Sequence, residues 1–188
     1  EAIFMQKGSN IKRLCVSAIM IALATVLSLI KVYTLPLGGS ITLLSMLPIV
    51  FLSVNYGIGW GFFSAFAYSL IQFFLDLAAI SSWGLTPAIF IGCIVFVYVL
   101  AYTALGIAGI FRNKGALGAA LGTCLALFLR FFSHLLSGLI LFRSYEMFNS
   151  PFLWSLCYNG SYMLPEMIFT ATGAALLFKN KAIQKLLD

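Results

Sequence analysis

Long apolar stretches with almost no charge constrain this chain more than any other feature of its sequence. The first runs from Leu14 to Ile30, and similar stretches recur up to the C-terminal region. Of the 188 residues, 62% are apolar and 9% are charged, whereas soluble domains carry about 25% charged residues. A small soluble fold leaves much of its surface exposed and could not bury so much apolar side chain, and disorder requires the opposite composition. The sequence therefore predicts an integral membrane protein.

A membrane-spanning helix needs about 20 residues, so the chain has room for six spans but for no separate soluble domain. We predict an all-α bundle of six transmembrane helices that forms a single domain over residues 1–188. Residues 1–12 are expected to be a cytoplasmic N-terminal segment, in which Met5 is a candidate for the natural first residue. The predicted spans are Arg13–Ile30, Thr42–Asn55, Trp60–Leu77, Ala88–Phe111, Ala116–Phe142 and Phe152–Phe178.

Basic residues at the ends of these spans predict the orientation of the bundle. Six spans place both termini on one side, and the basic residues of that side are Lys7, Lys12, Arg13, Arg112, Lys114, Lys179, Lys181 and Lys185. The other side has only Lys31 and Arg143. The positive-inside rule therefore predicts cytoplasmic termini. The loops at 31–41, 77–87 and 143–151 then face outward, and a site open to the outside would lie beneath them.

Polar residues at membrane depth are costly and are often functional. Arg130 and Glu166 are predicted to form a structural ion pair between the fifth and sixth spans, although either could instead line a cavity. His134, Gly138 and Phe142 follow Arg130 at intervals of four, so the four residues lie along one face of the fifth helix. This face is a candidate cavity lining.

The sixth span begins with an unusual density of polar and aromatic residues. Trp154 and Tyr158 have a simple explanation as interfacial anchors. Asn159 does not, because a buried amide needs hydrogen-bond partners. Ligand pockets combine aromatic walls with a few polar groups, so this segment is the best candidate for a binding site.

The sequence argues against an enzyme and against a metal centre. Four cysteines are scattered along the chain and only one histidine is present, whereas a zinc site needs about four converging ligands. The sequence also contains no phosphate-binding glycine motif, so ATP and Mg²⁺ used in transport would be bound by partner subunits. We expect no cofactor in this chain.

Four segments, in order, resemble the thiamine-specific S component of energy-coupling factor transporters, a class of ABC-type vitamin uptake system. They are Leu37–Pro48, Ala101–Gly109, Arg130–Gly138 and Ser155–Glu166. The resemblance implies a substrate-binding subunit in the bacterial cell membrane that works with a transmembrane coupling protein and two ATPase subunits. It also implies that Ala18 and Ala22 face the coupling protein.

The same resemblance implies that Tyr98, His134, Gly138 and Asn159 occupy ligand-binding positions. At three further positions the chain departs from the family pattern. Val97 replaces an acidic residue, Phe142 a tryptophan and Trp154 a tyrosine.

Thiamine is a cation, and Val97 cannot supply a charge to pair with it. Glu166 could supply one unless Arg130 already neutralises it. The sequence therefore predicts a neutral aromatic ligand such as hydroxymethylpyrimidine or pyridoxine. The alternatives are thiamine itself as the ligand, or a stand-alone proton-coupled secondary transporter that uses Glu166 or His134.

Overall fold

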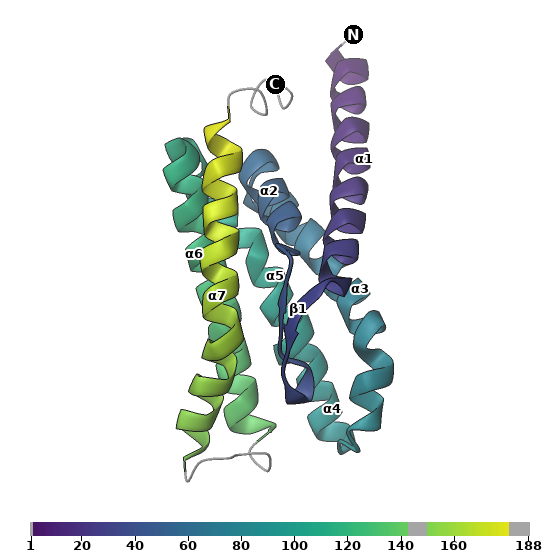
Figure 1. The fold of residues 1–188 in the computed structure, drawn as a ribbon. Coiled ribbons are helices and arrows are strands. Elements are labelled where there is room, and N and C mark those ends of the chain that lie inside the picture. The colour runs from purple at the N-terminus through teal and green to yellow at the C-terminus, as the bar shows by residue number, and fades with distance from the viewer. Residues whose placement is uncertain (1, 143–149, 181–188) are drawn as a thin grey trace.

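Helices dominate the computed structural model, which describes residues 2–142 and 150–180, with side chains from Asn10 onward except at Leu37. Figure 1 shows an elongated bundle in which the first turn of α1 (Ala2–Leu29) and the last turn of α7 (Pro151–Lys179) lie at the same end. We call this end the terminal end. The predicted basic residues Arg143, Lys181 and Lys185 lie outside the described residues.

After α1 the chain forms a small hairpin and then returns to helices. Strands β1 (Lys31–Thr34) and β2 (Ser40–Thr42) are joined by the short turn η1 (Pro36–Gly38), and α2 (Leu47–Tyr56) and α3 (Ile58–Ser82) follow. The next helical stretch consists of α4 (Pro87–Cys93), the wider π-helical η2 (Ile94–Leu100), α5 (Ala101–Thr103) and the tighter 3₁₀-helical η3 (Ala104–Lys114). It is followed by α6 (Gly115–Ile140) and α7.

The hairpin shows that the all-α prediction was wrong for residues 31–42. The two strands pair antiparallel, with Tyr33 opposite Ile41 and Thr34 opposite Ser40. β-Branched and aromatic side chains favour this extended conformation. The second helix then begins only at Leu47, with Pro48 in its first turn, where a proline costs no helical hydrogen bond. It is therefore shorter than the predicted span Thr42–Asn55.

The chain reverses direction between η3 and α6. Phe111 leaves the helical conformation, and Gly115 has a φ of 60°, which glycine adopts without strain. Beyond this turn the two helices pack antiparallel at very short range. A Cβ atom added to Gly122 would lie 1.9 Å from the carbonyl oxygen of Ala108. Glycine is therefore required for α6 to approach η3 this closely.

The half of the bundle near the terminal end is close-packed around Ser53 of α2. Its hydroxyl donates a hydrogen bond to the carbonyl of Gly106 and accepts one from the N–H of Gly109 at 2.8 Å. A side chain at Gly109 would collide with the backbone of Ser53. These contacts join α2 to η3 through backbone and small side chains, which leaves the other half of the bundle to hold the cavity described below.

The outer surface of the bundle is apolar, as a lipid environment requires. Exposed side chains include Ile19 (66% exposed) on α1, Phe74 (66%) on α3 and Leu176 (64%) on α7. The stretches long and apolar enough to cross a membrane are Asn10–Leu29, Ile58–Ser82, Pro87–Ile140 and Pro151–Lys179. The third of these contains the reversal at Gly115. The prediction of an integral membrane protein agrees with this surface.

Candidate ligand-binding site

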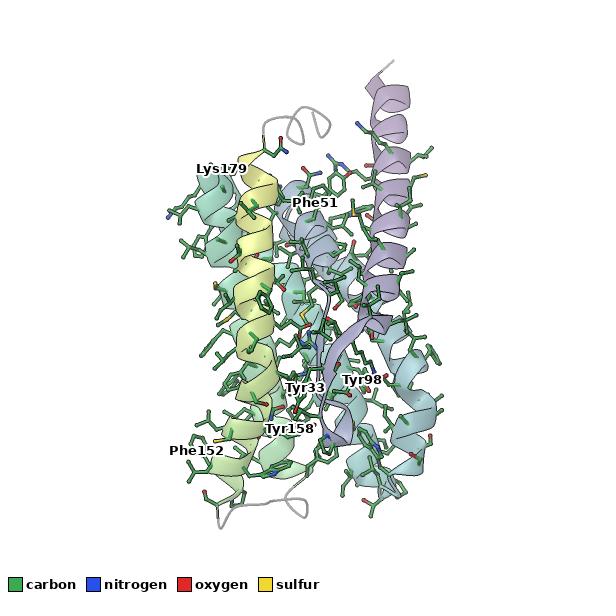
Figure 2. The ribbon with its side chains drawn as sticks, viewed as in Figure 1. Tyr33, Phe51, Tyr98, Phe152, Tyr158 and Lys179 are labelled. Carbon is green, nitrogen blue, oxygen red and sulfur yellow. The ribbon has the colours of Figure 1, made fainter. Side chains whose placement is uncertain are left out.

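A cavity of about 310 Å³ lies between the hairpin and helices α3, η2, α5, α6 and α7. Its size falls at the lower end of the range for small-molecule pockets, about 300–1,000 Å³. Figure 2 labels two of its aromatic residues, Tyr98 and Tyr158, in the half of the molecule away from the terminal end. All the predicted substrate-binding residues line it: Val97, Tyr98, His134, Gly138, Phe142, Trp154 and Asn159.

Aromatic rings form the walls of this cavity. Trp154 and Tyr158 stack on each other, with ring centroids 5.2 Å apart and planes inclined by 14°. Trp83, from the end of α3, meets Phe142 edge to face at 6.1 Å. Flat aromatic faces in a partly enclosed cavity favour a planar ring as the ligand.

The hairpin is fastened to α7 and closes one side of the cavity. The Tyr158 hydroxyl accepts a hydrogen bond from the N–H of Gly39 at 3.0 Å and donates one to the carbonyl of Pro36. A Cβ atom added at Gly39 would lie 2.8 Å from that hydroxyl and 2.9 Å from the ring of Tyr162. Glycine at this position therefore lets the hairpin lie directly on the tyrosines.

One face of α6, beside the cavity, carries buried polar atoms without hydrogen-bond partners in the described part of the chain. Arg130 Nε, His134 Nε2 and Ser137 Oγ are buried and have no hydrogen-bond partner among the residues that the structure describes. The three residues are four and three positions apart, which places them on the same helix face, and all three line the cavity. Buried polar atoms are nearly always hydrogen-bonded in folded proteins. Of the seven such unpartnered atoms in the described part of the chain, these three are the ones whose residues line the cavity. The protein thus leaves hydrogen-bonding capacity unused beside the cavity.

The predicted ion pair between Arg130 and Glu166 needs a correction. Both residues line the cavity, but within the described part of the chain no direct ion pair joins them. Glu166 accepts hydrogen bonds from the hydroxyl and the N–H of Thr42 in the hairpin. Arg130 donates to the sulfur of Met46 and lies 4.3 Å from the ring centroid of Tyr102. The two charges interact through space, and each is held by a different neighbour.

Asn159 and Gly138 also have structural roles in the contact between α6 and α7. The Asn159 amide nitrogen donates to the carbonyl of Ser155 at 2.9 Å, and its oxygen accepts from the hydroxyl of Tyr162 at 2.9 Å. The hydrogen-bond partners that this buried amide was expected to need are thus supplied by α7 itself. A Cβ atom at Gly138 would lie 2.1 Å from the Ser155 hydroxyl oxygen, so glycine is needed there for packing.

Asp76 is a cavity residue that the sequence analysis missed. It lies on α3, is half-buried, and accepts a hydrogen bond from the Tyr98 hydroxyl at 3.1 Å. It is the only acidic residue within the predicted third span, and that signal could have identified it, because a carboxylate at membrane depth is rarely incidental. The prediction of a neutral ligand therefore overlooked one carboxylate of the cavity.

Comparison with known proteins identifies the family. The model of a family described as thiamine transporter protein (Thia_YuaJ) matches residues 14–186, a range that contains the whole cavity lining. The chain belongs to this thiamine transporter family. The thiamine transporter ThiT of Bacillus subtilis (strain 168) is 29% identical over 189 residues, which cover 93% of this chain and 94% of that protein.

A solved structure of ThiT from Listeria monocytogenes shares the fold. Its TM-score is 0.75 at 21% sequence identity, and the match covers 95% of this chain and 98% of the other. The resemblance inferred from the sequence is therefore confirmed. As a member of the thiamine transporter family, the chain is a multi-pass cell membrane protein of a vitamin transport system.

The two alanines expected to face the coupling protein lie on the outer surface of the bundle. Ala18 and Ala22 are both exposed on α1, whereas Ala24 is fully buried against the bundle. Their position leaves the small-residue face of α1 accessible from outside the bundle. Their role at a partner interface stays a prediction.

Proposed function

We propose that this protein is the substrate-binding S component of an energy-coupling factor transporter and that its ligand is thiamine. The observation that carries the proposal is the convergence of all seven predicted binding positions on one cavity of about 310 Å³. These residues are far apart in the sequence, so they line one cavity only because of the way the chain folds. The matching family and the B. subtilis relative are both described as thiamine transporters, which supports the same ligand.

The chemistry of the cavity suits the two rings of thiamine. Stacked and edge-on aromatic side chains can hold flat heterocycles. The unpartnered atoms of His134 and Ser137 can exchange hydrogen bonds with the nitrogen atoms of an aminopyrimidine. The neutral ligand predicted from Val97 loses its basis, because Asp76 places a carboxylate in the same cavity. Thiamine, the alternative considered from the sequence, is therefore the better-supported ligand.

The transport mechanism belongs to the same proposal. We propose six membrane spans, counting α2 and the two arms on either side of Gly115 separately, with both termini in the cytoplasm. The exposed Ala18 and Ala22 would contact the transmembrane coupling protein, since small residues four apart permit close helix approach. ATP and Mg²⁺ would be bound by two ATPase subunits. Co-purification of the tagged chain from its native membrane should recover these partners, and recovery of the chain alone would contradict the coupling.

Intrinsic fluorescence provides a direct test of the ligand, because two tryptophans line the cavity and a third does not. Trp83 and Trp154 are cavity residues. Trp60 instead donates a hydrogen bond to the Ser17 hydroxyl at 2.7 Å, on the contact between α3 and α1. Thiamine is expected to quench the fluorescence of the purified protein with saturable binding.

A pair of matched variants tests whether the fluorescence quenching comes from a tryptophan of the cavity. Trp154→Phe should remove much of the quenching, whereas Trp60→Phe should retain it. Hydroxymethylpyrimidine and pyridoxine should bind more weakly than thiamine. Saturable binding of either compound without a response to thiamine would refute the proposed ligand.

A further inference from the structure

Two carboxylates line the cavity, and they differ in how far their charge is compensated by neighbouring groups. Glu166 lies on α7 and Asp76 lies on α3, so they approach the cavity from separate helices. Whether a buried carboxylate can bind a cationic ligand depends on how far its charge is already compensated by the protein. The hydrogen-bond donors and charges around each carboxylate therefore decide which of the two can pair with a cation.

The charge of Glu166 is compensated within the protein. The hydroxyl and the N–H of Thr42 both donate to one of its oxygens, and Arg130 attracts it through space. Hydrogen bonds to a charged group are among the stronger ones in proteins. Glu166 thus serves to hold the hairpin beside the buried arginine, and little of its charge is left for a ligand.

Asp76 has much weaker compensation. Its recorded hydrogen bond comes from the neutral hydroxyl of Tyr98, at 3.1 Å. The cavity is also lined by two basic side chains, Arg130 and Lys31, but neither forms an ion pair with Asp76 in the described part of the chain. Lys31 is exposed at the start of β1. One hydrogen bond from a neutral donor compensates little of the charge of a half-buried carboxylate, so a nearby cation stabilises it.

Aromatic rings pack around Tyr98, the residue that donates to this carboxylate, and they define the shape of the cation. Tyr98 stacks on Tyr102, with centroids 6.3 Å apart and planes inclined by 24°, and Phe73 packs edge-on against Tyr98 at 5.6 Å. These contacts fix the phenol that orients Asp76. The adjoining cavity residue Val97 adds an apolar surface without a polar group. A carboxylate beside aromatic faces favours a flat cation with delocalised charge over a compact, strongly hydrated one.

We propose that Asp76 is the residue that selects a cationic heteroaromatic ring, with its carboxylate pairing with the positive charge of the ligand. Tyr98 is the positioning residue that orients this carboxylate. The inference rests on the proposed function, because it assigns a role in the site that would bind thiamine. It places the selectivity for charge on α3, a helix on which the sequence analysis predicted no site residue.

Comparing two ligands of nearly the same shape, one charged and one neutral, measures the contribution of the ligand's charge to binding. Thiamine carries a positive thiazolium ring, and in 3-deazathiamine a carbon replaces the charged nitrogen, so the molecule is neutral. The parent protein in detergent should bind thiamine at least about tenfold more tightly than this neutral isostere. Asp76→Asn should weaken thiamine binding by about 10- to 100-fold, as expected for a hydrogen-bonded charge pair, and should change binding of the isostere by less than about threefold.

Ser137→Ala is the matched control. It removes an unpartnered hydroxyl from the same cavity without altering charge, so it should affect both ligands equally. Equal binding of the two ligands by the parent, or an equal loss of both in Asp76→Asn, would overturn the role of Asp76. The first of these measurements needs no variant and stands even if Asp76→Asn fails to fold. If the parent binds neither ligand, the proposed function fails instead.

Discussion

Gly138→Ala is the substitution for which the structure gives the clearest quantitative expectation. The new Cβ atom would lie 2.1 Å from the Ser155 hydroxyl oxygen and 2.8 Å from the Ser155 Cβ. Rotation of the hydroxyl alone cannot relieve the second contact, so α7 must move away from α6. Overpacking of this kind costs about 1–3 kcal/mol.

The hydrogen bonds around Ser155 add to this cost. Its hydroxyl donates to the carbonyl of Leu135 at 3.0 Å and accepts from the Asn159 amide at 3.2 Å. Ser155 is fully buried, so water cannot replace a lost partner, and each bond contributes about 1 kcal/mol. We therefore expect the free energy of unfolding to fall by about 2–4 kcal/mol. Movement of α7 also displaces Trp154 and Asn159, so thiamine affinity should fall by at least about tenfold.

Thermal unfolding in detergent, followed with and without thiamine, measures both effects. Gly160→Ala is the matched control on α7. Its added Cβ would lie 3.9 Å from the Leu164 Cδ1, which is an ordinary van der Waals contact. Replacing this helical glycine should leave binding intact and raise stability by about 0.5–1 kcal/mol. If Gly138→Ala unfolds at the parent temperature and binds thiamine as tightly as the parent, the close packing inferred here is wrong.

Two further predictions concern the hairpin and the reversal of the chain. Tyr158→Phe removes the hydroxyl that holds Gly39. Hydrogen exchange of the hairpin backbone and the dissociation rate of thiamine should therefore both rise by about 3- to 10-fold, as expected for the loss of about 1 kcal/mol. Unchanged rates would show that the bond does not restrain the hairpin. Gly122→Ala should abolish the folded protein in size-exclusion chromatography, because its Cβ would lie 1.9 Å from the Ala108 carbonyl oxygen, whereas Gly59→Ala, which meets nothing within 4 Å, should elute as the parent does.

Much of the helical architecture could be predicted from hydropathy and from the residues that interrupt it. The last predicted span, Phe152–Phe178, differs from α7 (Pro151–Lys179) by one residue at each end. Proline begins this helix, and the apolar stretch ends at a lysine. Such boundaries are encoded locally, because each depends on a few adjacent residues.

The hairpin and the short second helix could not be predicted in the same way. Residues 40–46 are apolar enough to extend a membrane helix, but Ser40–Thr42 pair with β1 and Leu44 adopts a φ of 56°. Pairing with β1, whose partner residues lie 6 to 11 positions earlier in the chain, outweighs the local hydropathy. The clue was the run of Val32, Tyr33 and Thr34, whose side chains favour strands.

The candidate site shows the same division between local and non-local information. The intervals of four from Arg130 to Gly138 correctly indicated one helix face, and the structure turns that face toward the cavity. No pattern within α6 could indicate which face of α3 meets it. The lone carboxylate of the third span marked Asp76 as a candidate, but its bond to the Tyr98 hydroxyl depends on how α3 packs against η2 and could not be predicted from either segment.

The two halves of the bundle have different physical roles, which explains how one small chain can hold a polar cavity inside a membrane. Near the terminal end, Ser53, Gly109 and Gly122 bring helices together through backbone contacts. The Ser53 hydroxyl there donates to the carbonyl of Gly106 and accepts from the N–H of Gly109. Among the residues described, both halves hold buried polar atoms without partners: Asn55 Nδ2 near Ser53, and His134 Nε2 and Ser137 Oγ beside the cavity. Each such atom costs about 1–3 kcal/mol, and the close-packed half must supply the stability that tolerates this cost. A ligand that bonds to the atoms of His134 and Ser137 would gain affinity from groups that the protein already holds in place.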